Sequence, residues 1–186
     1  MKIIYAIGHS DHTIERFIEL LKIHGITAVA DVRSAPYSRR HPQFNKDAID
    51  DSLKAVGIAY VFLGKELGAR QQVADFDSIA LTDGFKSGIE RVLKGSEDHR
   101  IALMCAEKEP LNCHRTLLVC RNLKKQAIDI MHILYDGTLE YHRDTESRLL
   151  KLTGCDKEEL FMSDTERLEL AYKKRGGDIA YKVDNK

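Results

Sequence analysis

The chain has 186 residues, of which 43% are apolar, a size that suits one well-packed domain and is short for two. Its 29 basic and 29 acidic residues balance, so no global charge attracts it to nucleic acid or to a membrane, although a local basic patch remains compatible with this balance. No apolar run approaches the roughly 20 residues of a membrane span, and the first ten residues become polar too early for a secretory signal. We therefore expect a cytoplasmic protein without a membrane partner, whose four cysteines are free thiols.

The first half of the chain alternates strands and helices. Residues 2–7 are a branched apolar run that ends at Gly8, which is typical of a strand entering a turn. Apolar residues then recur at the spacing of one helical face over 14–21, and Gly25 follows as a stop signal. We predict further strands at 26–32 and 58–63, with a helix over 49–56 between them.

The second half continues this alternation after a weakly periodic stretch. Residues 64–83 carry several charges, and we expect a long connection there with a short helix or a mobile flap. Helical spacing resumes over 85–92, and a helix over 113–125 follows Asn112, a favourable N-cap residue. Strands are predicted at 100–104 and 128–135.

Strands that recur about every 25 to 40 residues, with helices between them, favour a parallel sheet covered on both faces. We therefore predict a three-layer αβα domain over residues 1–143, with a mainly parallel central sheet of about five strands. Beyond it, Asp156 with Glu159 and Ser163 with Glu166 fit capping-box spacing. Residues 144–186 are thus predicted to form a helical C-terminal extension that packs on the domain or on a partner subunit.

Polar groups follow every predicted strand. In an open parallel sheet, ligands bind outside the carboxyl ends of the strands, where loops meet and helix N-termini direct free N–H groups outward. The residues at these ends are His9 and Ser10, Asp31 and Arg33, Lys65 and Glu66, Cys105 and Glu107, and Asp136. Strand ends are often polar only because they are solvated. The combination of acids, an arginine and a cysteine at one edge nevertheless favours a functional site.

Two cysteines are the most specific indication of chemistry at this edge. Cys105 ends a buried strand, whereas Cys113 falls in the first turn of a helix, where the helix dipole favours a thiolate and predicts a lowered pKa. His114 and Arg115 add positive charge that suits an anion. Cys120, seven positions after Cys113, is interpreted as an inert core thiol.

The spacing around these cysteines excludes several familiar sites. Seven residues separate Cys105 from Cys113, which matches neither a thioredoxin-like pair nor a zinc ribbon. Arg115 lies ten positions after Cys105, so the loop is not the phosphatase or sulfurtransferase type in which five residues separate cysteine from arginine. A metal ion held by the two cysteines and a histidine remains an alternative.

A basic loop over 33–44 is the second notable element. Two prolines stiffen it, and its arginines, histidine and aromatic residues suit a phosphate, a carboxylate or a nucleotide base. Lys65, Glu66 and Arg70 are candidates for the opposite rim. The alternative is a solvated surface loop and an exposed turn.

Taken together, these segments resemble one known family. The resemblance rests on Ile7-Gly8-His9-Ser10, Asp31-Val32-Arg33, Pro36 with Ser38-Arg39, Pro42 with Phe44, Leu67-Gly68, Met104-Cys105-Ala106-Glu107 and Cys113-His114-Arg115. In this order they are similar to the family called domain of unknown function 488, over about residues 2–142, with His132 and His142 also at family positions. The resemblance implies a compact α/β domain with a site around the matched residues, and it implies no substrate.

Our preferred functional hypothesis is an enzyme that acts on an anionic small molecule or a nucleotide-like group. The residues expected to bind the anion or substrate are Ser10, Arg33, Ser38, Arg39, Phe44, His114 and Arg115. Cys105 or Cys113 would supply a thiolate nucleophile, and Glu107, Asp31 or His9 would transfer protons.

Two other classes stay open on the sequence alone. One is a non-catalytic module that binds a nucleotide or nucleic acid through the same arginines and aromatic residues, with structural or redox-sensing cysteines. The other is a cysteine-ligated metal site. The residues name no cofactor and no oligomeric state.

Overall fold

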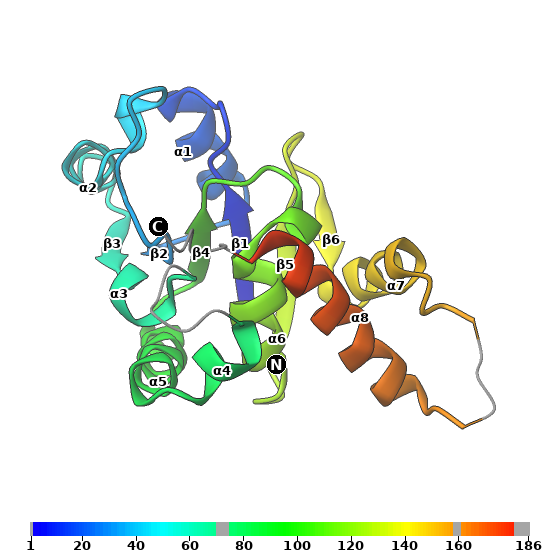
Figure 1. Ribbon diagram of the computed structural model, residues 1–186. Coiled ribbons are helices and arrows are strands. Elements are labelled where there is room, and N and C mark those ends of the chain that lie inside the picture. Colours follow the sequence, from blue (N-terminus) through cyan, green and yellow to red (C-terminus); the bar gives the residue numbers. More distant parts are fainter. Residues whose placement is uncertain (1, 70–74, 158–160, 181–186) are drawn as a thin grey trace, which may run out of the picture.

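A computed structural model describes residues 2–69, 75–157 and 161–180 and shows an α/β fold built on one six-stranded sheet (Figure 1). The strands are β1 (Ile3–Gly8), β2 (Ala28–Asp31), β3 (Ala59–Phe62), β4 (Ile101–Cys105), β5 (Asp129–Ile133) and β6 (Leu139–Tyr141). Their order is β3-β2-β4-β1-β5-β6; the first five are parallel, and β6 pairs antiparallel with β5. The predicted α/β class and mainly parallel sheet are confirmed, with one antiparallel strand added at the edge.

Helices cover both faces of the sheet. One face carries α1 (Ile14–Ile23), η1 (Pro42–Phe44) and α2 (Lys46–Lys54). The other face carries α3 (Gly64–Leu67), α4 (Phe76–Leu81), α5 (Asp83–Asp98), η2 (Pro110–Asn112), η3 (Arg115–Cys120), α6 (Arg121–Lys124), α7 (His142–Thr153) and α8 (Asp164–Ile179). Within the described ranges, no helix combines the length and the apolar character that crossing a membrane requires.

The alternation of side chains along the strands creates two separate cores. In β4, Ala102 and Met104 pack with Phe17 of α1, while Leu103 and Cys105 face the opposite cluster. Both clusters consist of residues that are nearly inaccessible to solvent. This two-sided burial explains why the central strands read as continuous apolar runs in the sequence.

Two segments differ in detail from their predictions. The connection over 64–83 contains the short helices α3 and α4, and residues 70–74, with Arg70, lie outside the described part of the chain. The helix predicted over 113–125 is a π-helix in η3 that passes into α6. Because π-helical turns widen the helix and accompany functional sites frequently, this irregularity draws attention to the residues just before it.

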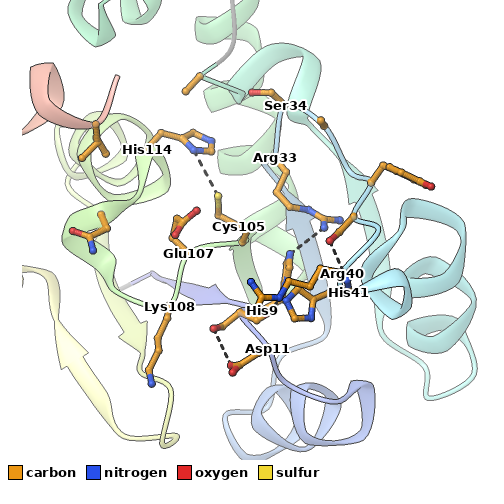
Figure 2. Close-up of a pocket in the computed structure, with 18 of the residues that line it drawn as sticks. His9, Asp11, Arg33, Ser34, Arg40, His41, Cys105, Glu107, Lys108 and His114 are labelled. Atoms are coloured by element: carbon orange, nitrogen blue, oxygen red, sulfur yellow. Dashed lines mark hydrogen bonds between the residues drawn. The ribbon is translucent and has the colours of Figure 1, made fainter. Parts of the chain in front are cut away.

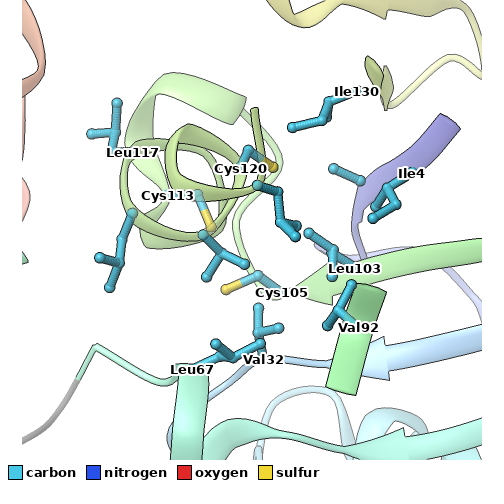
Figure 3. Close-up of a cluster of buried hydrophobic side chains, with 14 of the residues drawn as sticks. Ile4, Val32, Leu67, Val92, Leu103, Cys105, Cys113, Leu117, Cys120 and Ile130 are labelled. Atoms are coloured by element: carbon cyan, nitrogen blue, oxygen red, sulfur yellow. The ribbon is translucent and has the colours of Figure 1, made fainter. Parts of the chain in front are cut away.

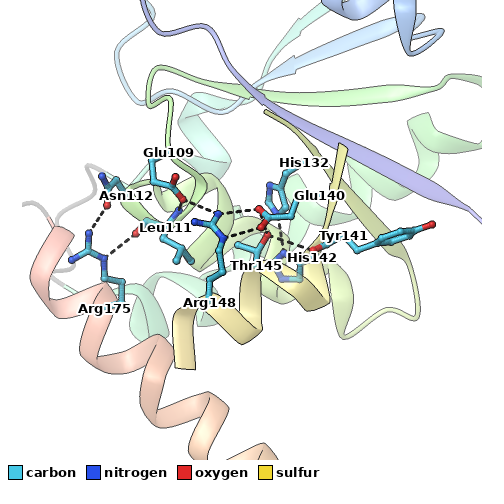
Figure 4. A network of polar contacts seen from close by, with 10 residues as sticks. All are labelled: Glu109, Leu111, Asn112, His132, Glu140, Tyr141, His142, Thr145, Arg148 and Arg175. Atoms are coloured by element: carbon cyan, nitrogen blue, oxygen red, sulfur yellow. Dashed lines mark hydrogen bonds and ion pairs between the residues drawn. The ribbon is translucent and has the colours of Figure 1, made fainter. Parts of the chain in front are cut away.

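The C-terminal helices pack on the same core as the sheet. Leu149 of α7 and Tyr172 of α8 belong to the buried cluster beneath η3. Figure 4 shows Arg148 of α7 bound to Glu109 at 2.9 Å, and Arg175 of α8 donating to the Leu111 carbonyl at 2.9 Å. These contacts clamp η2, the segment that leads from β4 into η3. The predicted limits of the two domains stay a prediction.

The topology leaves a crevice at the carboxyl ends of β1 and β4. The chain leaves β1 towards α1 on one face of the sheet, and it leaves β4 towards η3 on the other face. Neighbouring strands whose connections diverge in this way form a topological switch point, where ligands bind in open α/β sheets. The segments that follow the two strands remain paired, since His9 N–H donates to the Cys105 carbonyl and Ser10 N–H to the Ala106 carbonyl, each at 2.9 Å.

The substitution Gly8→Ala tests the close approach of the β4 loop to the end of β1. A Cβ atom at this position would lie 1.9 Å from the Glu107 carbonyl oxygen, so Gly8→Ala must push the β4 loop away. We expect the free energy of unfolding to fall by about 1 to 3 kcal/mol, the usual cost of overpacking. Urea denaturation measures the change. Gly84→Ala in α5 is the matched control, because nothing lies within 4 Å of its Cβ position; equal stability of the two variants would contradict the close approach.

Candidate functional site

A cavity of about 780 Å³ opens among the segments that follow β1, β2 and β4 (Figure 2). Phe76 of α4 and Ile179 of α8 also line it. The members of the predicted site that line the cavity are His9, Ser10, Arg33, Ser38, Cys105, Glu107 and His114. Residues more than a hundred positions apart in the sequence therefore meet at one edge of the sheet, as expected from the ends of parallel strands.

The other members of the predicted site do not line the cavity. Arg39 is exposed on the loop, whereas Asp31, Phe44, Cys113 and Arg115 are buried. The Phe44 ring stacks on the His9 ring with 4.3 Å between centroids. Phe44 was expected to stack on a ligand, but the Phe44 ring stacks on the His9 ring instead.

A buried ion pair between Asp31 and Arg33 organises the first half of the site. Arg33 Nη2 lies 2.6 Å from Asp31 Oδ2, and both side chains are almost inaccessible, at 6% and 0% exposure. Arg33 also donates to the Phe44 carbonyl at 2.8 Å, and the Tyr60 hydroxyl donates to Asp31 at 2.7 Å. With its oxygens engaged in this way, Asp31 holds the loop over 33–44 in place instead of facing a substrate.

His9 is held as a neutral ring. Its Nδ1–H donates to the Ser10 carbonyl at 3.0 Å, and its Nε2 accepts from Arg33 Nη1 at 3.1 Å. Burial, followed by the charge of Arg33, lowers the pKa of His9 from 6.5 to about 4. Both ring nitrogens are therefore occupied, which leaves His9 poorly suited to the proton transfer predicted for it. Ser10 beside it has a φ of 45°, a backbone conformation that non-glycine residues seldom adopt.

Cys105 and His114 form the central contact of the cavity. Cys105 Sγ lies 3.6 Å from His114 Nδ1 (Figure 2). His114 Nε2–H donates to the Val32 carbonyl at 2.9 Å. The backbone carbonyl fixes the ring so that Nδ1 faces the sulfur. Although burial disfavours a charged ring, the negative charge of Cys105 raises the pKa of His114. The pair thus favours a thiolate beside an imidazolium.

The surroundings lower the pKa of Cys105 and raise the pKa of Cys113. A hydrogen bond from Cys113 lowers the pKa of Cys105 well below its ordinary value, and the charges of His114 and Arg115 act in the same direction. Burial, together with the bond to Cys105, raises the pKa of Cys113 well above its ordinary value. The lowered pKa predicted for Cys113 from the helix dipole is wrong, because Cys113 is only 1% exposed and desolvation outweighs the dipole.

Arg115 is a buried cation instead of a surface anion-binding residue. It is 1% exposed, and its Nε and Nη1 atoms have no hydrogen-bond partner among the described residues. Its charge lowers the pKa of Cys105. We interpret it as part of the electrostatic surroundings of the thiolate, in a place that the sequence spacing alone did not reveal.

Glu107 was predicted as a site residue from the sequence, whereas four other residues of the cavity were not. Glu107 stands beside the Cys105 sulfur in Figure 2; burial and then the charge of Cys105 raise its pKa, which suits a group that exchanges protons. Arg40, His41, Lys108 and Asn112 also line the cavity. Only their position in the sequence pointed to them, since Arg40 and His41 lie in the basic loop and Lys108 and Asn112 lie between the two cysteines.

The same sulfur and nitrogen atoms constitute a group that can hold a metal ion. The ligand atoms of Cys105, Cys113 and His114 all lie within 4.8 Å of one another. Thiolates and an imidazole, with the imidazole fixed by a backbone carbonyl through its other nitrogen, are a donor set that zinc favours. The residues present fit such an ion.

Fold and cavity together define a three-layer α/β protein with a cysteine–histidine pair at the carboxyl edge of its sheet. The chain also matches the model of the family described as domain of unknown function DUF488 over residues 13–121, more than half of its length. The chain belongs to this family, which confirms the resemblance seen in its motifs. No curated protein and no solved structure gives a significant match.

The buried ion pair can be tested by removing one charge. Asp31→Asn keeps the size of the side chain but leaves the Arg33 guanidinium buried without its counter-charge. We expect the free energy of unfolding to fall by about 3 to 5 kcal/mol. Denaturant titration would measure it, with Glu19→Gln as control, since the exposed Arg16–Glu19 pair should contribute less than about 1 kcal/mol. Similar losses in both variants would contradict the role given to Asp31.

Proposed function

We propose that this protein is a cysteine-dependent enzyme that acts on an anionic small molecule, with Cys105 as its nucleophile. The observation that carries the proposal is the Cys105–His114 contact of 3.6 Å in the lining of the cavity. A nucleophilic thiol next to a base that is itself oriented by a third group is the arrangement used by cysteine enzymes on unrelated folds. Here the third group is the Val32 carbonyl.

Glu107 and His114 are the residues best placed to move protons. His114 exchanges a proton with the Cys105 sulfur through Nδ1, because Nε2 remains engaged with the backbone. Glu107 lines the cavity, and the raised pKa of its carboxyl group brings it closer to neutral pH. His9, in the cavity lining, and Asp31, buried outside it, have structural roles in this proposal, since their polar atoms are already hydrogen-bonded.

We assign the binding of the anion to the cations at the rim of the cavity. Arg33 uses its guanidinium on Asp31, His9 and the Phe44 carbonyl. Arg40 and Lys108 line the cavity from opposite segments and are exposed, so they can approach a negatively charged group. A cavity of about 780 Å³ suits a small molecule or a nucleotide-like group better than a nucleic acid strand, and the buried Phe44 ring offers no stacking platform.

Alkylation kinetics test the nucleophile. We expect iodoacetamide to modify Cys105 with a pH–rate midpoint below the value of about 8.5 for an ordinary thiol, because the thiolate persists to lower pH. Trypsin separates Cys105, Cys113 and Cys120 into the peptides 101–108, 109–115 and 116–121, so mass spectrometry reports each cysteine individually. His114→Asn should move the midpoint upward.

Cys120→Ala is the matched control for the alkylation test. Cys120 is fully buried, and burial raises its pKa to about 12. Its removal should leave the Cys105 profile unchanged. A Cys105 midpoint at or above 8.5 in the wild-type protein would overturn the nucleophile, whatever the variants do.

Metal binding is a second candidate, favoured by the grouping of Cys105, Cys113 and His114 within 4.8 Å. Three protein ligands leave one position open on a tetrahedral ion, as in catalytic zinc sites. In that arrangement Cys105 would be a ligand, so the two candidate functions make opposite predictions for its reactivity.

Zinc titration separates the two candidates. If the metal candidate is right, metal-free protein should bind one zinc ion per chain in competition with a chromophoric chelator, and bound zinc should suppress alkylation of Cys105. Cys113→Ala should weaken binding strongly, because it removes one of three ligands, whereas Cys120→Ala should not. No competition for zinc by the wild-type protein would eliminate this candidate and leave the nucleophile standing.

A further inference from the structure

We propose that Cys105 and Cys113 form a two-thiol redox centre, in which Cys105 is oxidised by a small hydroperoxide from the cavity and Cys113 resolves the oxidised sulfur as an intramolecular disulfide. This inference rests on the proposed function, because it requires Cys105 to be the reactive thiol. It adds an oxidant, a small hydroperoxide that reacts with the same thiol, and a role for a cysteine that does not line the cavity.

The two sulfur atoms are neighbours with unequal access to solvent. They lie within 4.8 Å of each other, and Cys105 alone lines the cavity. In Figure 3 the Cys113 side chain, which lies between η2 and η3, points towards the end of β4, where Cys105 is located. Cys113 is 1% exposed and Cys105 5% exposed, and only Cys105 borders the cavity from which a dissolved reagent would arrive. A buried thiol beside a thiol that lines the cavity is suited to resolving the oxidised form of that neighbour.

Cys120 shows that not every buried thiol of this region is equivalent. It lies further along the helix, toward Ile130 in Figure 3, and is fully buried in the apolar cluster. It does not belong to the group of ligand atoms within 4.8 Å. Cys120 therefore serves as an internal reference for a thiol that is close in sequence but outside the centre.

The chemistry balances in two steps. The Cys105 thiolate attacks one peroxide oxygen, the O–O bond breaks, and the leaving alkoxide or hydroxide takes a proton from solvent in the cavity. Sulfur loses two electrons, the peroxide gains them, and Cys105 becomes a sulfenic acid. The Cys113 sulfur then attacks Cys105, so that the S–S bond forms, the S–O bond breaks, and hydroxide leaves with the Cys113 proton as water.

The surroundings of the pair favour its reduced state. His114 faces the Cys105 sulfur, and the buried Arg115 guanidinium has two nitrogens without a partner among the described residues. Formation of the disulfide removes the negative charge that these cations stabilise. A disulfide whose reduced form is stabilised in this way is easily reduced. We therefore expect an ordinary thiol such as glutathione to restore the reduced centre.

Stepwise oxidation of the full chain tests the proposal. Metal-free, reduced protein is treated with one equivalent of hydrogen peroxide, digested with trypsin without reduction, and analysed by mass spectrometry. We expect the peptide 101–108 linked to 109–115, and the link should disappear after treatment with glutathione. Cys113→Ala should instead accumulate a sulfenic acid at Cys105, trapped by dimedone, and Cys120→Ala should behave as wild type.

Three outcomes would overturn the inference. The first is oxidation of wild-type Cys105 to sulfinic acid without the linked peptides, the second is a link to the Cys120 peptide, and the third is dimedone trapping that does not differ between wild type and Cys113→Ala. A low alkylation midpoint at Cys105 combined with any of them would reject the redox centre and retain the nucleophile. An ordinary alkylation midpoint would reject both.

Discussion

The ion pair between Asp31 and Arg33 holds together the segments from which the site is built. Asp31 is the last residue of β2. Arg33, in the loop that follows, donates to His9, the residue after β1, and to the Phe44 carbonyl of η1. Burying two charges carries a desolvation cost that the attraction between them offsets only when geometry and hydrogen bonding are good. Such a pair adds little net stability, but it fixes the positions of the segments that carry it, because its partners have few alternative arrangements.

The positive charges of the site differ in what they contact. Arg33 is committed to Asp31, and His114 and Arg115 lie near the Cys105 sulfur. The buried cations therefore serve groups of the protein itself. Arg40 and Lys108 line the cavity and are exposed, and the Lys108 ammonium packs over the Tyr135 ring. Charges whose surroundings are fixed by the fold in this way are electrostatically preorganised.

The second half of the site depends on how the chain leaves β4. Gly8 lets the Glu107 carbonyl approach β1, and α7 and α8 clamp η2 before the π-helix begins. This path turns the Cys113 side chain inward next to Cys105. The C-terminal helices thus take part in positioning the site although they contribute little to its chemistry.

The amino-acid sequence by itself determined the alternating strands and helices, the parallel sheet and the edge at which polar groups meet, because these depend on periodicity and on the shared direction of strand ends. It also pointed to Cys105, Glu107 and His114. Tertiary structure alone decided which charged side chains line the cavity and which cysteine has the lowered pKa. The dipole argument favoured Cys113, but the pKa of a thiol also depends on desolvation and on neighbours contributed by distant segments, which no local pattern encodes. Burial likewise depends on distant segments, and Arg115 and Phe44, which were predicted to contact a ligand, are buried and do not line the cavity.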